Sequence, residues 1–181
     1  SLGNVVLAVA AARGGDFKAA QQQVSKASKR RINRLVMPLV TAWTQVGSKN
    51  FEGATKSLSA LGKRKAFTDF QHYHGALVDD LAGKNVDAET AYRALVDDEN
   101  GGNLRWYKAY GNFLERNGRS SEAISLYKRA LSRDPDAPVL AQLLSSAERG
   151  TVPNRFVPDA RSGLAEALFG VASVLSQEGA L

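Results

Sequence analysis

The sequence contains no cysteine and only two histidines among its 181 residues. Without cysteine, the chain has no disulfide scaffold, no thiolate metal ligand and no cysteine nucleophile. His72 and His74 are two residues apart, so on a helix they point to different faces and do not converge on one ion. We therefore predict no metal site and no cofactor.

Catalytic motifs and long apolar runs are also missing. No glycine-rich phosphate loop follows a strand, and there is no G-x-S-x-G motif, so no residue is predicted to be catalytic. The longest apolar run, Val5 to Ala12, is far shorter than the roughly 20 residues that span a bilayer. The sequence predicts no transmembrane segment, and it shows no recognisable signal peptide.

Acidic charge is scarce in the first third of the chain. Residues 1–67 hold 12 Lys and Arg against only Asp16 and Glu52, which gives +10, whereas residues 68–181 carry −4. The basic run from Lys26 to Arg34 could attract nucleic acid or anionic lipid. No aromatic residue is interleaved with these charges for base stacking, so nucleic-acid binding is kept only as an alternative.

What the sequence does contain is a repeat. Four alanines are separated by 34, 34 and 35 residues, and each is followed four positions later by a larger apolar or aromatic residue. The alanines are Ala20, Ala54, Ala88 and Ala123, and the larger residues are Val24, Leu58, Tyr92 and Tyr127. A period of about 34 residues indicates a solenoid of helix–turn–helix units. In such an array neighbouring units build one continuous core and leave an extended concave surface.

The clearest unit runs from Leu104 to Ala137. Its signature residues are Tyr107, Tyr110, Gly111, Leu114, Gly118, Ala123, Tyr127, Ala130 and Pro135. This stretch resembles the tetratricopeptide repeat (TPR) family, with Tyr107 in place of the usual tryptophan. The resemblance implies an all-α fold, a right-handed superhelical solenoid of antiparallel helix pairs. It also implies a non-enzymatic scaffold that binds a peptide, a helix or a partner subunit in its concave groove.

We divide the chain into approximate units within a single array, residues 1–181. These are 1–32, 33–68, 69–103 and 104–137, followed by a helix over 138–150, a connection over 151–159 and the start of a further repeat over 160–181. The turn at residues 47–50 is expected to be longer than the others, and Pro38 is expected in the first turn of its helix. The apolar stripe of the last helix has no cover in this scheme, which predicts self-association.

The predicted partner-binding residues lie on one face of the best repeat. Arg105, Lys108, Asn112 and Arg116 follow helical spacing, opposite the tyrosines that pack inward. Lys108 and Asn112 resemble two positions of the carboxylate clamp of the TPR family, although residues 138–149 offer no asparagine to complete it. Trp43 and Tyr73 are added as candidate groove anchors, with burial in the core as the alternative.

Two further functions stay open. One is a self-assembling structural module, and the other is a basic surface that binds nucleic acid or anionic lipid. The alanine-, leucine- and arginine-rich composition resembles bacterial TPR proteins of the cell envelope, which favours the periplasm over the cytoplasm. We also expect the chain to be a piece of a longer bacterial array.

Overall fold

A computed structural model describes residues 2–26, 33–63, 65–97 and 102–177. These residues form α-helices, one 3-10 turn and no strand. The helices are α1 (Leu2–Arg13), α2 (Phe17–Ser25), α3 (Asn33–Gly47), α4 (Phe51–Ser59), α5 (Thr68–Leu81), α6 (Asn85–Val96), α7 (Leu104–Arg116), α8 (Ser120–Arg133), α9 (Pro138–Glu148) and α10 (Ala160–Gln177), with the 3-10 turn η1 at Lys65–Phe67.

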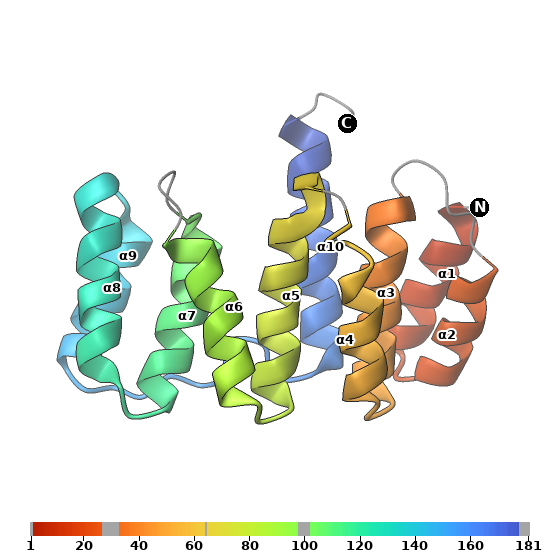
Figure 1. The fold of residues 1–181 in the computed structure, drawn as a ribbon, viewed down its shortest axis with the longest axis horizontal. Coiled ribbons are helices and arrows are strands. Elements are labelled where there is room, and N and C mark those ends of the chain that lie inside the picture. The colour runs from red at the N-terminus through yellow and green to blue at the C-terminus, as the bar shows by residue number, and fades with distance from the viewer. Residues whose placement is uncertain (1, 27–32, 64, 98–101, 178–181) are drawn as a thin grey trace.

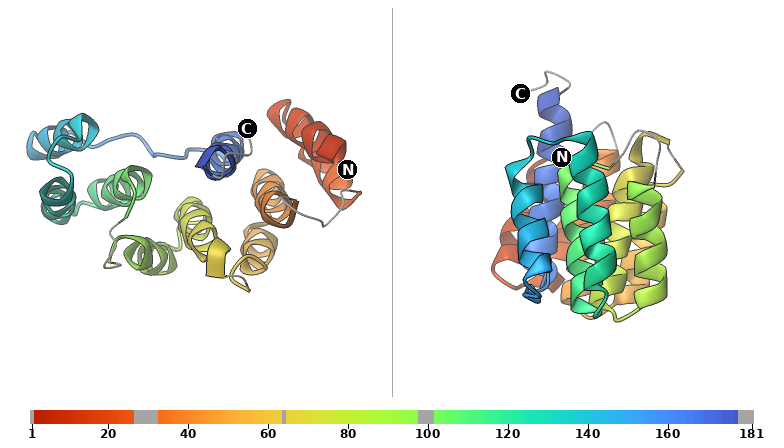
Figure 2. Two further views of the ribbon diagram at one scale, coloured as in Figure 1. Left: turned by 90° about the horizontal axis from the view of Figure 1, so that it is seen from above. Right: turned by 90° about the vertical axis from the view of Figure 1, so that its left-hand side faces the viewer.

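Antiparallel helix pairs stand side by side in a row, in chain order (Figure 1). Seen from above, α3, α5 and α7 lie on one side of the row and α4, α6 and α8 on the other (Figure 2). We call the side formed by α3, α5 and α7 the inner face. The arrangement is a helical solenoid, in agreement with the fold class that the sequence predicts.

The periodic alanines occupy equivalent places in the outer helices. Ala20, Ala54, Ala88 and Ala123 are each the fourth residue of α2, α4, α6 and α8, and all four are fully buried. Because an alanine has the smallest side chain that still favours a helix, the paired helices can approach closely there. The larger residue one turn later is buried beside it in every pair, which completes the core.

The turns within the first four pairs have equal length, which corrects the expectation of a longer turn at 47–50. Three residues separate the helices in each pair, and the middle one has a positive φ: Gly15, Lys49, Gly83 and Gly118, with φ between 62° and 88°. Lys49 therefore occupies the position that glycine holds elsewhere. Gly47 is the last residue of α3 and lies two positions before the residue with positive φ. Because glycine is the residue expected at such a left-handed position, Gly47 makes the turn look longer in the sequence than it is.

Pro38 also lies deeper in its helix than expected. Helix α3 covers Asn33–Gly47, so Pro38 is inside it and not in its first turn. Leu35 and Val36, ahead of the proline, are buried and belong to the same apolar stripe. Burial of these side chains offsets the loss of one backbone hydrogen bond at the proline.

The end of the chain departs most from the predicted division. Helix α9 packs against α8, but α10 does not stack on α9 as the start of a further repeat. Instead, residues 151–159 run back along the inner face, and α10 packs mainly against α3 (Figure 2). Leu164 and Val171 of the predicted apolar stripe are buried, and Leu168 and Leu175 are partly buried against the core, so the stripe does not lie uncovered as predicted. Both helices are apolar on the sides that meet, and each covers the other.

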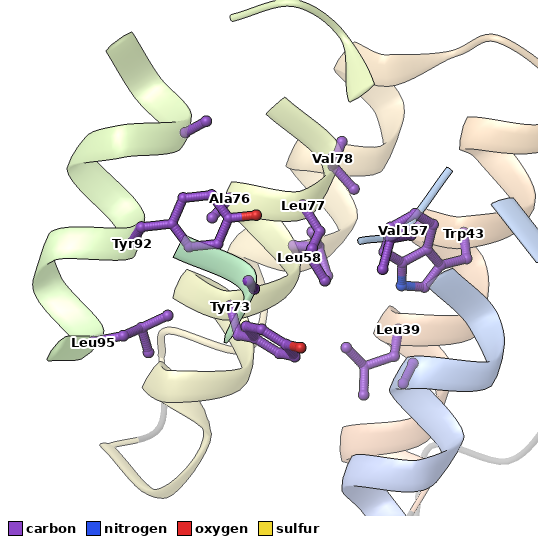
Figure 3. Packing of buried hydrophobic residues seen from close by; sticks show 14 of the residues in the cluster. Leu39, Trp43, Leu58, Tyr73, Ala76, Leu77, Val78, Tyr92, Leu95 and Val157 are labelled. Atoms are coloured by element: carbon purple, nitrogen blue, oxygen red, sulfur yellow. The ribbon is translucent and has the colours of Figure 1, made fainter. Parts of the chain in front are cut away.

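We name residues 151–159 the strap, and the strap together with α10 the inner segment. Figure 3 shows the ring of Trp43, from α3, beside α10, which is drawn in blue. No helix among the residues described is both long and apolar enough to cross a membrane.

Candidate functional site: the inner face and its occupant

Helix α7 presents the predicted binding residues as one row. It begins after Asn103, whose side chain accepts hydrogen bonds from the backbone N–H groups of Arg105 and Trp106 at 2.9 and 3.1 Å. Such a cap fixes the start of the helix and hence the direction in which its side chains point. From there Arg105, Lys108, Asn112 and Arg116 recur every three or four residues on the side that meets the inner segment.

Asn112 binds the main chain of the strap. Its Nδ2 donates to the carbonyl oxygen of Asn154 at 2.8 Å, and its Oδ1 accepts from the N–H of Phe156 at 3.0 Å. Arg116 Nε donates to the same Oδ1 at 2.9 Å and fixes the orientation of the amide. Both strap contacts are to backbone atoms, so this interaction does not depend on which side chains the bound segment carries.

A buried carboxylate lies beside this amide. Asp80, at the end of α5, is 5% exposed and forms an ion pair with Arg116. Arg155 of the strap approaches the other carboxylate oxygen at 3.8 Å. Two guanidinium groups therefore share one carboxylate, and one of them belongs to the inner segment. A basic side chain in the strap is thus matched by negative charge on the inner face.

Glu166 of α10 makes the second charged contact. It is 7% exposed, and it is bound by both Arg105 Nε and Arg105 Nη2 and by the hydroxyl of Tyr73, which donates at 2.7 Å. Burial acts to raise the pKa of Glu166, but the hydrogen bonds from Arg105 and Tyr73 outweigh it and hold the pKa below its ordinary value. Glu166 is therefore ionised at neutral pH, and its charge is compensated. Burial, together with the neighbouring Glu166, raises the pKa of Tyr73, which stays protonated and able to donate.

Trp43 and His74 form the floor under the first turn of α10. Trp43 Nε1 donates to His74 Nδ1 at 3.2 Å, which assigns the imidazole proton to Nε2. His74 is 1% exposed, and burial lowers its pKa to about 4, so the ring is neutral at physiological pH. Gly163 lies directly against the indole, where a Cβ would overlap three of the ring carbons of Trp43. The pinned indole therefore leaves room only for glycine at this point of the bound helix.

The rim of the site is aromatic and basic. Lys108 is exposed, and its Nζ lies 5.5 Å from the centre of the Phe156 ring. The Arg105 guanidinium lies 4.3 Å from the centre of the Phe169 ring. Next to this contact, α5, α7 and α10 enclose a hollow of about 480 Å³, lined in part by Phe70, Trp106 and Phe169. Phe169 is 52% exposed, so apolar surface remains open beside the inner segment.

The structure thus brings together the residues singled out from the sequence, but around a segment of the same chain. Arg105, Asn112 and Arg116 contact the inner segment or support its contacts, and Lys108 lies over the strap. Trp43 is fully buried and Tyr73 is 6% exposed, so in this structure both belong to the core between the inner face and α10. They would face the groove only if the inner segment were absent from it.

Sequence reasoning missed the other half of the site. Asp80, Gly163 and Glu166 take part, as do the strap residues Asn154 to Phe156. The signal that could have found them is the pair Pro153 and Pro158, which mark an irregular connection, followed by a helix with glycine and glutamate three residues apart. The basic run tells us less, because Lys29, Arg30 and Arg31 lie outside the described residues. Among the residues that are described, no group of three potential metal ligands comes together.

Comparison with known proteins supports the assignment of the repeat. Residues 82–138, from the end of α5 to the start of α9, match a family model described as tetratricopeptide repeat. The comparisons with curated proteins and with solved structures gave no match. Repeats of this family are typically non-catalytic modules that serve as scaffolds for protein–protein interaction. Residues 82–138 therefore contain a tetratricopeptide repeat, and they lie within an all-helical solenoid.

Proposed function

We propose that this protein is a binding scaffold whose inner face holds a protein segment made of an extended stretch followed by a helix. The observation that carries the proposal is the contact of Asn112 with both a carbonyl oxygen and an N–H group of the strap. A side chain that satisfies the backbone of an extended chain in this way is suited to peptide recognition. Its chemistry would serve a partner segment as well as it serves the inner segment.

The inner face is organised before any ligand arrives. Arg116 is held by Asp80 and in turn orients Asn112, while Trp43 is fixed by His74. These pairs lie wholly on the inner face, so they do not require the inner segment. Little side-chain entropy is then lost on this side of the interface, which favours binding.

A partner would have to compete with the inner segment. A tethered segment acts at an effective concentration on the order of millimolar, so a free partner must bind the inner face more tightly or be locally concentrated. The tether thus sets a threshold that weak or non-specific partners do not pass.

The test uses a purified partner, first identified by affinity capture from a native extract at physiological salt. Its affinity is then measured by calorimetry for three forms: the unchanged chain, Lys108→Glu and Lys56→Glu. Lys108 lies on the inner face, whereas Lys56 is an exposed lysine of the outer helix α4, so the two substitutions are matched in charge. We expect Lys108→Glu to weaken binding about tenfold and Lys56→Glu to leave it unchanged. Equal affinities for all three forms would place the partner elsewhere on the protein.

A further inference from the structure

The contacts of the inner segment define the kind of partner that the inner face accepts. Resting on the proposed function, we infer that the partner segment carries four features in order: a basic residue and an aromatic residue in an extended stretch, then a helix with glycine followed three residues later by an acidic residue. In the inner segment these are Arg155, Phe156, Gly163 and Glu166. Each feature meets a matching group on α3, α5 or α7.

The glycine is required by the floor of the site. The Trp43 indole is fully buried and hydrogen-bonded to His74, so it cannot turn aside without losing that bond. Because the space above the ring is filled by the backbone of α10 at Gly163, any side chain there would keep the helix from reaching its place. A partner helix therefore needs a glycine at the point that faces Trp43.

The acidic residue is selected by charge and by spacing. Three residues along a helix return to nearly the same face, so a carboxylate at this distance from the glycine points back toward the inner face. There Arg105 offers two donors and the Tyr73 hydroxyl a third. An amide or an apolar residue in place of the carboxylate would leave the half-buried guanidinium of Arg105 without a negatively charged partner. A basic residue at the same place would be repelled by Arg105.

The extended stretch is read by opposite charge and by cation–π contacts. Arg155 lies near the buried carboxylate of Asp80. The ring of Phe156 lies 5.5 Å from Lys108 Nζ and 5.8 Å from the Arg105 guanidinium carbon, a separation at which a cation is attracted to an aromatic face. Between these side chains Asn112 fixes the main chain, and hence the register of the whole segment.

All four features fall within a short stretch of chain, from residue 155 to residue 166. None of them involves Thr151 or Val152, the exposed first two residues of the strap, through which it is joined to α9. A separate segment with this pattern would therefore make the same contacts as the tethered one.

The experiment uses the full chain carrying Gly163→Leu, which keeps the tethered helix from its place, and a fluorescent peptide of residues 151–177 as the probe. Anisotropy should show saturable one-to-one binding. Peptides carrying Gly163→Leu or Glu166→Lys should bind at least about tenfold more weakly, whereas Ala172→Lys, on the exposed side of α10, should bind like the unchanged peptide. Adding Arg105→Glu to the chain should restore binding of the Glu166→Lys peptide.

A second form of the protein covers the case in which Gly163→Leu prevents folding, as judged by circular dichroism. It is the otherwise unchanged chain with a protease site inserted after Thr151. This chain is cut in the folded state, and the labelled peptide should then exchange with the released inner segment on the inner face. Equal binding of all the peptides would refute the residue pattern while leaving the proposed scaffold function intact. A chain that binds its purified partner but none of the peptides would refute it as well. So would a dimer, seen by light scattering, that the peptide does not dissociate, because the occupant would then be a second copy.

Discussion

Gly163→Ala is the smallest change that tests how the inner segment is held. Gly163 lies in the first turn of α10, and a methyl group added there would lie well inside 3.0 Å of three carbons of the Trp43 indole. That ring is fully buried and hydrogen-bonded to His74, so the strain cannot be relieved by a simple rotation. The helix must move away from α3, or the indole must leave its bond.

The expected magnitude follows from two opposing effects. Overpacking of a filled core costs about 1–3 kcal/mol. Replacing glycine by alanine in a helix recovers up to about 1 kcal/mol, and less than that near a helix end. We therefore expect the free energy of unfolding to fall by about 1–2 kcal/mol. For a chain of this length each kcal/mol corresponds to about 2–4 °C in melting temperature.

Urea denaturation followed by tryptophan fluorescence measures this loss, and hydrogen exchange locates it. Exchange should become faster in the strap and α10, while α7 and α8 keep their protection. Gly75→Ala is the matched control, because Gly75 lies inside α5 with no atom near the added methyl group. That substitution should stabilise the chain by up to about 1 kcal/mol. If Gly163→Ala proves as stable as Gly75→Ala, the argument from the pinned indole is wrong.

Two more predictions concern the array itself. Gly111→Ala places a methyl group against the phenol of Tyr127, which is fully buried. Overpacking costs about 1–3 kcal/mol and the gain in helix propensity returns up to about 1 kcal/mol, so thermal denaturation should show a net loss of about 1–2 kcal/mol. An unchanged melting temperature would contradict it. Acidification should also destabilise the protein through His74, whose pKa is about 4 when folded and 6.5 when unfolded. Below pH 6.5 the unfolded chain gains a proton that the folded chain refuses, so stability is lost as the pH falls from 6.5 to 4. His74→Gln should show a shallower fall in urea midpoint over this range, and an identical profile would refute the assignment.

Much of the array could be predicted from local patterns. The alanine period placed four outer helices correctly, because a small residue is needed wherever two helices of a pair approach closely. The row formed by Arg105, Lys108, Asn112 and Arg116 also followed from helical spacing alone. The failure at residues 47–50 has the same origin, since a lysine in the left-handed position carries no sequence signal comparable to glycine.

The sequence by itself determined the repeat unit, the helix pairs and the side of α7 that carries the row Arg105, Lys108, Asn112 and Arg116, because each depends on contacts within about 34 residues. Only the tertiary structure decided where α10 packs and what covers Trp43 and Tyr73. The pattern of apolar residues in α10 is equally compatible with stacking on α9 as the next repeat and with packing on the inner face at α3. The choice depends on two long-range contacts, Gly163 with Trp43 and Glu166 with Arg105. The partners are separated by 120 positions in the first contact and by 61 in the second. No periodicity encodes such pairs, and they form only when the folded array brings their surfaces together.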